Sequence, residues 1–359
     1  MRAVVVERVS LRNFRSYAAL DLDLAPGLVL VTGANGVGKT NLLEALHVGS
    51  QGFSPRTRAE TQLVRFGAGA ARVALAGAEG ASAVETDVVL RPRDGKRVMM
   101  NGAPLATVDE LRTRLSALVF LPDRLAVVKG GPLVRRRFFD RMLGRLFPVD
   151  GQLPVEYGRA LAQRNYALRR ARAGLSTRAA VAPWTRSVAE LGSELERARG
   201  EIVALLAPRF AAAAERLGLS GATLEYERQG VSVEELESRY EQDVVRGGTS
   251  VGPHLGDVRI VAACRDLRSF GSQGEQRAAV LALVLAEACL LVERRGTPPL
   301  LLLDDVLSEF DEERRSALVS ALPSGAQTVV TATSTRALPG DLGRPALVVE
   351  VTPGAARAR

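Results

Sequence analysis

Apolar residues near the N-terminus follow the patterns of two strands and a helix. Leucine alternates with aspartate over residues 20–24, which is the period-2 pattern of a half-buried strand. The continuous apolar run 28–31 predicts a short, fully buried strand, and a helical pattern follows over residues 41–47.

Residues 71–120 are expected to form a β-meander. Two hairpin-type dipeptides, Asp94-Gly95 and Asn101-Gly102, separate strand-like runs, and these residue types accept the positive φ angles of tight turns. The apolar run 118–120 is predicted to be the last strand of this meander.

A helical pattern extends from about residue 132 to residue 218. Apolar residues of the segment 188–205 recur at alternating steps of three and four, which fits a coiled-coil seam or an ordinary core-facing helix. We favour the core-facing helix because fewer than three heptads are present, and Pro208 is expected to end or kink the run. The segment 174–177 is predicted to be the turn between two antiparallel helices.

Strands and helices alternate again in the C-terminal third. A long buried helix is predicted over residues 278–292, and the apolar runs 300–303 and 328–331 predict buried strands. The segment 352–359 is expected to be frayed.

The basic charge of the chain is concentrated in one segment. The 359 residues include 48 Lys and Arg and 40 Asp and Glu, a formal net charge of +8. Residues 124–186 carry 14 basic and 3 acidic side chains, or +11, so the rest of the chain carries 8 − 11 = −3. Such a segment indicates either a polyanionic partner, most often nucleic acid, or a solvated helix surface.

Composition excludes several classes of protein. A hydrophobic content of 47% excludes global disorder, and no apolar run reaches the roughly 20 residues that a membrane span requires. Two cysteines make no disulfide framework and no signal-peptide pattern is seen, so we expect a cytoplasmic protein without a membrane partner.

Residues 33–40 match the phosphate-loop pattern G-x-x-x-x-G-K-[ST]. They follow an apolar strand and precede a helix, which is the context that the pattern requires. Lys39 is expected to reach the β- and γ-phosphates of ATP, and the Thr40 hydroxyl is expected to bind Mg²⁺. The predicted nucleotide-binding residues are Gly33, Ala34, Asn35, Gly36, Val37, Gly38, Lys39 and Thr40.

An apolar strand that ends in two acids, residues 300–305, predicts the second half of the site. Asp304 is expected to join the Mg²⁺ shell, and Asp305 to orient or deprotonate the attacking water. Lys39 and Asp304 are 265 residues apart, and no Asn-Lys-x-Asp guanine-reading segment occurs. The nucleotide fold is therefore predicted to be split by a large insertion that contains the basic segment.

Residues 272–276, directly before the long apolar helix, have the pattern of an ABC-type signature. The hydroxyl of Ser272 and the nearby N–H groups would form a second anion site at a helix N-terminus, and a plain N-cap serine is a compatible alternative. One chain does not readily use both anion sites on one γ-phosphate. We therefore expect an ATP-dependent head-to-tail homodimer in which Ser272, Gln273 and Gly274 face the ATP of the other chain.

These motifs together resemble the SMC group of ABC-type ATPases, and further blocks resemble the RecF family. The segments that carry the resemblance are 11–17 (Leu-Arg-Asn-Phe-Arg-Ser-Tyr), 120–123 (Phe-Leu-Pro-Asp), 128–132 (Val-Lys-Gly-Gly-Pro), 135–140 (Arg-Arg-Arg-Phe-Phe-Asp), 252–254 (Gly-Pro-His), 272–277 and 303–311. One departure is Leu255-Gly256-Asp257, where the family usually has Arg-Asp-Asp.

The resemblance implies an ATP-dependent DNA-binding protein of recombinational repair. Such proteins bind single-strand/double-strand DNA junctions or gaps and work with RecR and RecO to promote RecA loading. Arg12 and Asn13 of the opening block are further nucleotide-site candidates. Candidates for DNA contacts are Arg135, Arg136, Arg137, Arg141 and Arg145, although these could instead pair with acids across the dimer.

We expect an α/β fold, an ABC/SMC-like P-loop ATPase head with a mixed sheet and a β-meander, plus an inserted, mainly helical lobe. Residues 1–115 and 285–359 would form the ATP-binding lobe, and 116–284 the helical lobe with the basic segment and the signature. Slow hydrolysis is expected, because the segment 331–334 stands where transport ATPases carry a switch His and no Gln occurs between residues 118 and 130. Together with the resemblance, this implies a weak, DNA-stimulated ATPase. The alternatives are a transport ATPase subunit and an ATP-binding recruitment scaffold with negligible turnover.

Overall fold

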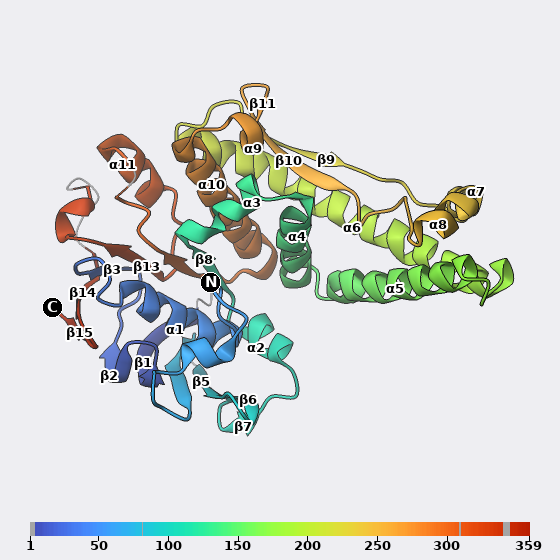
Figure 1. The fold of residues 1–359 in the computed structure, drawn as a ribbon. Coiled ribbons are helices and arrows are strands. Elements are labelled where there is room, and N and C mark those ends of the chain that lie inside the picture. The colour runs from blue at the N-terminus through green and yellow to red at the C-terminus, as the bar shows by residue number, and fades with distance from the viewer. Residues whose placement is uncertain (1–3, 81, 309, 340–344) are drawn as a thin grey trace. The chain divides into compact units, whose positions relative to one another are not determined.

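The computed structural model describes residues 4–80, 82–308, 310–339 and 345–359 (Figure 1). The chain forms two compact units. Unit 1 contains residues 1–125, 212–219 and 272–359, and unit 2 contains residues 126–211 and 220–271. The boundaries expected from the sequence, 116 and 284, differ from these, because residues 116–125 and 272–284 pack with unit 1.

One sheet of unit 1 is almost entirely parallel. Its strand order is β15-β14-β3-β13-β12-β8, and only β15 is antiparallel to its neighbour. The strands are β3 (Leu28–Thr32), β8 (Ala117–Phe120), β12 (Leu300–Leu303), β13 (Thr328–Ala332), β14 (Leu347–Thr352) and β15 (Ala355–Ala358). The apolar runs predicted as buried strands are confirmed in β3, β12 and β13, because a parallel sheet covered on both faces buries every side chain.

Two predictions about this sheet were wrong. The run 118–120 was expected to end the meander, but β8 pairs with β12 in the parallel sheet, with Ala117 opposite Leu300. All four residues of β8 are buried, whereas a half-exposed meander strand would alternate. The segment 352–359 was expected to fray, but β14 and β15 pair across the Pro353-Gly354 turn, where Gly354 has a φ of 76°.

The second sheet of unit 1 is antiparallel and contains the predicted meander. Its order is β2-β1-β4-β5-β6-β7. The strands are β1 (Val4–Phe14), β2 (Tyr17–Asp23), β4 (Ala71–Glu79), β5 (Ser82–Arg91), β6 (Gly95–Met100) and β7 (Ala103–Pro104). The Asp94-Gly95 and Asn101-Gly102 turns are confirmed, and β2 alternates buried and exposed residues as expected.

Helix α1 (Lys39–Gln51) is buried along most of its length, and one hydrophobic core contains its side chains and those of both sheets. Gly49 allows the close approach to β4, since a Cβ there would lie 2.6 Å from Leu75 Cγ. The long apolar helix predicted over 278–292 is confirmed as α10 (Gln273–Arg295). Unit 1 also contains η1 (Glu60–Leu63), α2 (Val108–Arg114), η2 (Pro122–Leu125), α11 (Glu312–Ser320) and η4 (Thr335–Ala337).

Unit 2 is mainly helical, with a small three-stranded sheet ordered β11-β10-β9. Its elements are α3 (Ala126–Lys129), α4 (Pro132–Leu146), η3 (Asp150–Gln152), α5 (Leu153–Arg172), α6 (Arg178–Arg216), β9 (Thr223–Glu227), α7 (Val233–Ser238), α8 (Tyr240–Arg246), β10 (Asp257–Ala262), β11 (Arg265–Asp266) and α9 (Leu267–Phe270). The last five residues of α6 belong to unit 1.

Three predictions about the helices of unit 2 can be checked directly. The turn at 174–177 is confirmed, because α5 ends at Arg172 and α6 begins at Arg178. Pro208 does not end the second helix, since α6 continues to Arg216. Most of the 188–205 stripe is buried, as expected for a core-facing helix.

A buried ion pair joins α5 to α8 within unit 2. Arg164 and Asp243 are both fully buried, with Nη1 2.8 Å from Oδ2. The same guanidinium also donates to Thr185 Oγ1, Thr249 Oγ1 and the Leu236 carbonyl. Because every charged group here has partners, the burial of the two charges is compensated.

Candidate nucleotide site

The phosphate loop connects β3 to α1. Gly33, Gly36 and Gly38 have φ angles of 154°, 81° and 119°, which other residues rarely adopt. A Cβ on Gly33 would also lie 2.5 Å from the Val351 carbonyl oxygen, so this position has no room for a side chain. The loop ends at the N-terminus of α1, where free N–H groups favour an anion.

Lys39 lies across the loop that it belongs to. Its Nζ donates to the carbonyl oxygens of Gly33 at 2.7 Å and Ala34 at 2.8 Å. Burial lowers the pKa of this amine, and the nearby Asp305 and Asp304 partly offset the effect. The side chain that the sequence assigns to the phosphates is thus held within the loop by two hydrogen bonds to carbonyls.

The structure brings Thr40 and Asp304 together across a separation of 264 residues. Thr40 Oγ1 donates to Asp304 Oδ2 at 2.9 Å. Thr331 Oγ1 donates to the other carboxylate oxygen at 2.8 Å, and the N–H of Asp305 donates to Thr331 Oγ1 at 2.9 Å. Burial raises the pKa of Asp304, and the hydrogen bonds from Thr331 and Thr40 act in the opposite direction.

Asp305 occupies an unusual position beside this cluster. Its φ of 52° lies in the left-handed region, which is uncommon for a residue other than glycine. Its buried Oδ1 has no hydrogen-bond partner within the described part of the chain. The residue lines a cavity of about 20 Å³ together with Arg277 and Phe310, which is room for about one water molecule.

Residues that the sequence interpretation missed surround α1. Glu44 is fully buried and accepts two hydrogen bonds from Arg15, each at 2.8 Å, and one from Arg56 at 3.1 Å. Tyr17 donates its hydroxyl hydrogen to the Gly38 carbonyl at 3.0 Å. Arg15 and Tyr17 belong to the 11–17 segment, so that segment holds the phosphate loop and its helix in place.

Arg12 and Asn13 have protein partners of their own. Arg12 forms an exposed ion pair with Asp21, 2.8 Å between Nη2 and Oδ2, and also donates to the Leu11 carbonyl. Asn13 has a φ of 50°, and its carbonyl accepts the N–H of Arg65. No hydrogen bond or ion pair in the described chain joins either residue to the phosphate loop, so their nucleotide role stays a prediction.

Ser272 caps α10. Its Oγ accepts the N–H of Glu275 at 3.2 Å, and Glu275 Oε2 accepts the N–H of Ser272 at 2.7 Å, which completes a capping box. Ser272 and Gln273 are exposed, so the helix N-terminus that they form is open to solvent. The cap and the signature interpretation are compatible, as expected.

The side chains predicted to bind the metal offer oxygen atoms, the ligand type that Mg²⁺ prefers. Thr40 and Asp304 offer a hydroxyl and a carboxylate side by side, and Mg²⁺ in phosphate sites takes oxygen ligands from few protein groups and from the substrate. Within the described residues no group of three or more His, Cys, Asp or Glu could hold a metal, as a dedicated protein cage would need.

One of the five arginines predicted to contact DNA was wrongly assigned. Arg135 is only 3% exposed, and its guanidinium forms two hydrogen bonds with Asp257 at 2.8 and 2.6 Å. Arg136 is half-buried, donates to the Gly256 carbonyl, and has a pKa lowered by burial. Arg137 and Arg141 are exposed on α4, one turn apart. Arg145, another turn on, is partly exposed.

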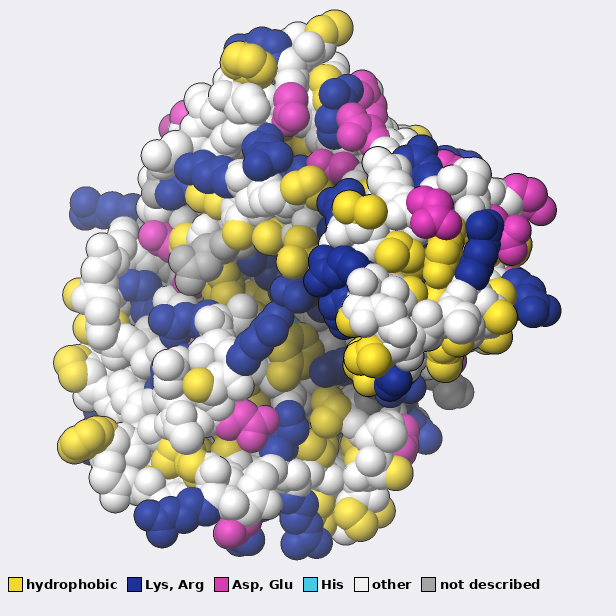
Figure 2. All heavy atoms as spheres, turned by 45° about the vertical axis from the view of Figure 1, so that its right-hand side comes forward, with side chains coloured by type: hydrophobic (Ala, Val, Ile, Leu, Met, Phe, Trp, Pro, Cys, Tyr) yellow, Lys and Arg dark blue, Asp and Glu magenta, His cyan; other side chains and the backbone are white. Residues whose placement is uncertain are grey.

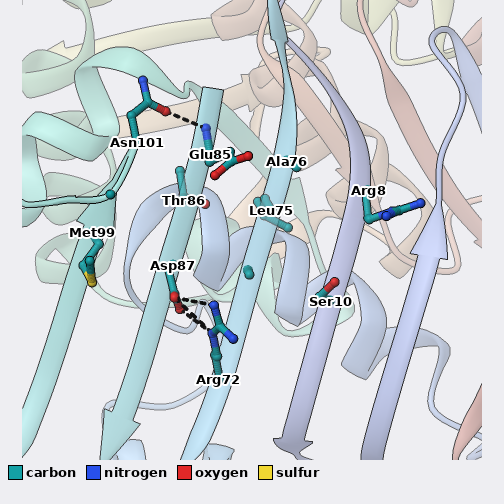
Figure 3. A pocket seen from close by; sticks show the side chains of 12 residues that line it. Arg8, Ser10, Arg72, Leu75, Ala76, Glu85, Thr86, Asp87, Met99 and Asn101 are labelled. Carbon is teal, nitrogen blue, oxygen red and sulfur yellow. Dashed lines mark hydrogen bonds and ion pairs between the residues drawn. The ribbon is translucent and has the colours of Figure 1, made fainter. Parts of the chain in front are cut away.

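Basic side chains are prominent on the face of the molecule in Figure 2, where Lys and Arg cover more of the surface than Asp and Glu. A separate hollow lies on the outer face of the meander sheet (Figure 3). Its two arginines are already engaged, since Arg72 forms hydrogen bonds with Asp87 and Arg8 pairs with Asp23, and none of its lining residues belongs to the phosphate loop. This hollow is therefore not the nucleotide site.

The two sheets, the phosphate loop and the acid-ended strand define a P-loop ATPase head of the SMC type. Residues 5–340 match the model of the RecF/RecN/SMC N terminal domain. An Smc head bound to the C-winged helix domain of ScpA shares the fold, with a TM-score of 0.60 at 16% identity over 99% of this chain and 96% of that one.

More similar proteins identify the family within the SMC group. The chain is 34% identical to the DNA replication and repair protein RecF of Heliobacterium modesticaldum, over 94% of this chain and 95% of that protein. It is 37% identical to that of Desulforudis audaxviator, over 93% and 95%. A solved structure of the recombination mediator protein RecF with ATP matches with a TM-score of 0.86 at 25% identity, over 100% of this chain and 98% of that one. The chain belongs to the RecF family.

No helix among the described residues is both long and apolar enough to cross a membrane.

Proposed function

We propose that the protein is an ATP-switched DNA-binding protein of recombinational repair. ATP would join two chains head to tail around DNA, and slow hydrolysis would release them. The observation that carries the ATPase part is the hydrogen bond between Thr40 and Asp304, which unites the phosphate loop with the acid-ended strand across 264 residues. Membership of the RecF family supports the DNA part.

The residues of the site have distinct roles in this proposal. Lys39 exchanges its two carbonyl partners for the β- and γ-phosphates, and Thr40 and Asp304 hold Mg²⁺, which neutralises charge that develops on the phosphates. Asp305 orients or deprotonates the attacking water, and its unpartnered Oδ1 leaves one oxygen available for that contact.

Two features support a head-to-tail dimer. The exposed N-terminus of α10 presents Ser272, Gln273 and Gly274 as a second anion site. Within the described residues Ser272 makes no hydrogen bond with the phosphate loop. The capping box uses the Ser272 N–H and a lone pair of its Oγ, so the hydroxyl hydrogen and the N–H groups of Gln273 and Gly274 would be the donors to the ATP of another chain.

DNA would be held mainly through its phosphates. Arg137, Arg141 and Arg145 of α4 are exposed or partly exposed, and binding through such residues weakens steeply with salt and shows little base preference. Single-strand/double-strand junctions or gaps are the proposed targets, and RecR, RecO and RecA the proposed partners in RecA loading. This function places the protein in the cytoplasm with the DNA.

A recruitment scaffold with negligible turnover is the second candidate. The segment 331–334 stands where transport ATPases carry a switch His, and the side chain of Asp305 is short for a general base. Measured ATP turnover with and without DNA separates the two candidates, because only the first predicts weak turnover that DNA stimulates.

The test uses the full chain and its Lys39→Met variant. Light scattering after size exclusion measures the mass, and filter retention of a gapped duplex measures DNA binding, each with ATP, ADP and no nucleotide at several salt concentrations. We expect ATP to produce a dimer that retains DNA, and Lys39→Met to lose both properties. Lys96→Met, which removes the same charge from β6, is the control. The mechanism is wrong if Lys39→Met dimerises and retains DNA like the unmodified chain.

A further inference from the structure

The helical hairpin formed by α5 and α6 in unit 2 has an unusual charge distribution. No Asp or Glu occurs from residue 157 to residue 189, and this stretch carries seven arginines. Only Arg164 is buried, where it pairs with Asp243. The six exposed arginines are Arg159, Arg169, Arg170, Arg172, Arg178 and Arg186. None of these six forms an ion pair within the described chain, so their charge is not neutralised internally.

One face of α5 combines two of these arginines with an exposed aromatic ring. Arg159, Tyr166 and Arg170 are separated by seven and four residues, so they lie within about 40° of one another around the helix. Tyr166 is 54% exposed, and the Arg170 guanidinium lies 6.0 Å from its ring centroid. The two arginines are about 16 Å apart along the axis, since a helix rises 1.5 Å per residue.

Another side of α5 contacts α8. Arg164 points into the buried network with α8, and Arg172 donates to the Val245 carbonyl at the end of α8. The helices α7 and α8 carry the acids of this part of unit 2, which are Glu234, Glu235, Glu237, Glu241 and Asp243. The solvent face of α5 is therefore mainly basic, and Glu156, one turn before Arg159, is the single acid of this helix.

We propose that this solvent face, defined by Arg159, Tyr166 and Arg170, contacts DNA at the single-stranded part of its target. The inference rests on the proposed function and assigns part of its DNA surface. The two guanidinium groups bind backbone phosphates, and the Tyr166 ring stacks on an unpaired base. Residues 153–189 carry seven arginines and one acid, Glu156, and this excess of positive charge favours a polyanion as the partner.

The experiment measures fluorescence anisotropy of labelled DNA with the full chain and ATP. One probe is a blunt duplex, and the other is the same duplex with a single-stranded overhang. The double variant Arg159→Gln/Arg170→Gln is compared with Arg97→Gln, which removes an exposed arginine from β6. We expect about tenfold weaker binding for the double variant, and a slope of log affinity against log salt reduced by about 1.5 to 2, since two phosphate contacts are lost. Arg97→Gln should bind like the unmodified chain.

The stacking contact is tested separately with the same two probes. Tyr166→Ala should weaken binding of the overhang DNA by about fivefold or more and leave the blunt duplex unaffected, whereas Tyr166→Phe should retain both. If Tyr166→Ala weakens binding of both probes equally, the stacking contact is wrong.

If the unmodified chain binds DNA with ATP but the arginine double variant keeps its affinity and salt slope, this inference is wrong and the proposed function stands. If the unmodified chain binds no DNA, the proposed function itself fails.

Discussion

The hydroxyl of Thr331 links the two acidic residues that follow β12. It donates to Asp304 Oδ1 at 2.8 Å and accepts the N–H of Asp305 at 2.9 Å. Thr331 is fully buried, so its own hydroxyl cannot exchange these two partners for bulk water. One side chain at the end of β13 thus sets the orientation of the Asp304 carboxylate and supports the left-handed backbone of Asp305.

Thr331→Val should impair the site, because valine has the same shape but leaves a buried oxygen of the Asp304 carboxylate and the N–H of Asp305 without this partner. We expect the free energy of unfolding to fall by about 1–3 kcal/mol. ATP turnover should fall about tenfold, which corresponds to about 1.4 kcal/mol in the barrier. Equilibrium denaturation and a phosphate-release assay measure the two effects. Thr331→Ser keeps the hydroxyl and should restore most of both, and a valine variant as active as the unmodified chain would rule out this role.

Arg135→Gln should destabilise unit 2 without acting on DNA directly. It would leave Asp257, which is 11% exposed in its side chain, as an uncompensated buried charge. Breaking a buried pair in this way costs about 3–5 kcal/mol. Urea denaturation checks this, with Arg137→Gln as the control, since an exposed substitution should change stability by no more than about 0.5 kcal/mol. Equal stability of the two variants would contradict the assignment of Arg135 to the core.

Glu44→Gln should loosen the contact between α1 and the 11–17 segment. Glu44 is fully buried and accepts hydrogen bonds from Arg15, Arg56 and Ser54. The side chains of Arg15 and Arg56 are partly exposed, so solvent partly compensates their charges. We therefore expect the free energy of unfolding to fall by about 3 kcal/mol, the lower end of the range for a broken buried ion pair. Thermal and urea unfolding measure it, and Glu7→Gln, an exposed residue of β1, should show no comparable loss. A Glu44→Gln variant as stable as the unmodified chain would contradict a stabilising role for the contact between α1 and the 11–17 segment.

His254 should make stability depend on pH. The Thr249 carbonyl only accepts, so Nε2 carries the ring hydrogen and Nδ1 accepts the Tyr157 hydroxyl at 2.7 Å. Burial lowers the pKa of His254 below its ordinary 6.5, so the folded chain keeps it neutral. As the pH falls through 6.5, His254 binds a proton in the unfolded chain but stays neutral in the folded chain. The free energy of unfolding therefore decreases.

Urea denaturation at several pH values between about 7.5 and 5.5 tests this (a window of about one pH unit on either side of the ordinary pKa). His254→Gln should lose stability less steeply on acidification than the unmodified chain, because it lacks the group that titrates. Parallel curves for the two proteins would show that His254 contributes nothing to the pH dependence.

Local patterns along the chain predicted much of the fold. Alternation in β2, continuous apolar runs in β3 and β12, and the Asp94-Gly95 turn all report interactions within a few residues, and each was confirmed. The strand over 117–120 was found but placed in the wrong sheet. A strand that is apolar on both faces pairs in the sheet that can bury both of them. Which sheet this is depends on elements far away in the sequence.

The sequence by itself determined the phosphate loop, the acid-ended strand and the capped signature helix, because the backbone geometry of each requires particular residues at fixed spacing. Only the tertiary structure decided which charged side chains are buried. Arg135 and Arg137 are two positions apart on one helix, yet the first is buried against Asp257 and the second is exposed. Thr331 likewise became part of the site only when β13 came to lie beside β12. A buried charge or hydroxyl must find its partner in space, and residues 27 or 122 positions away supply it.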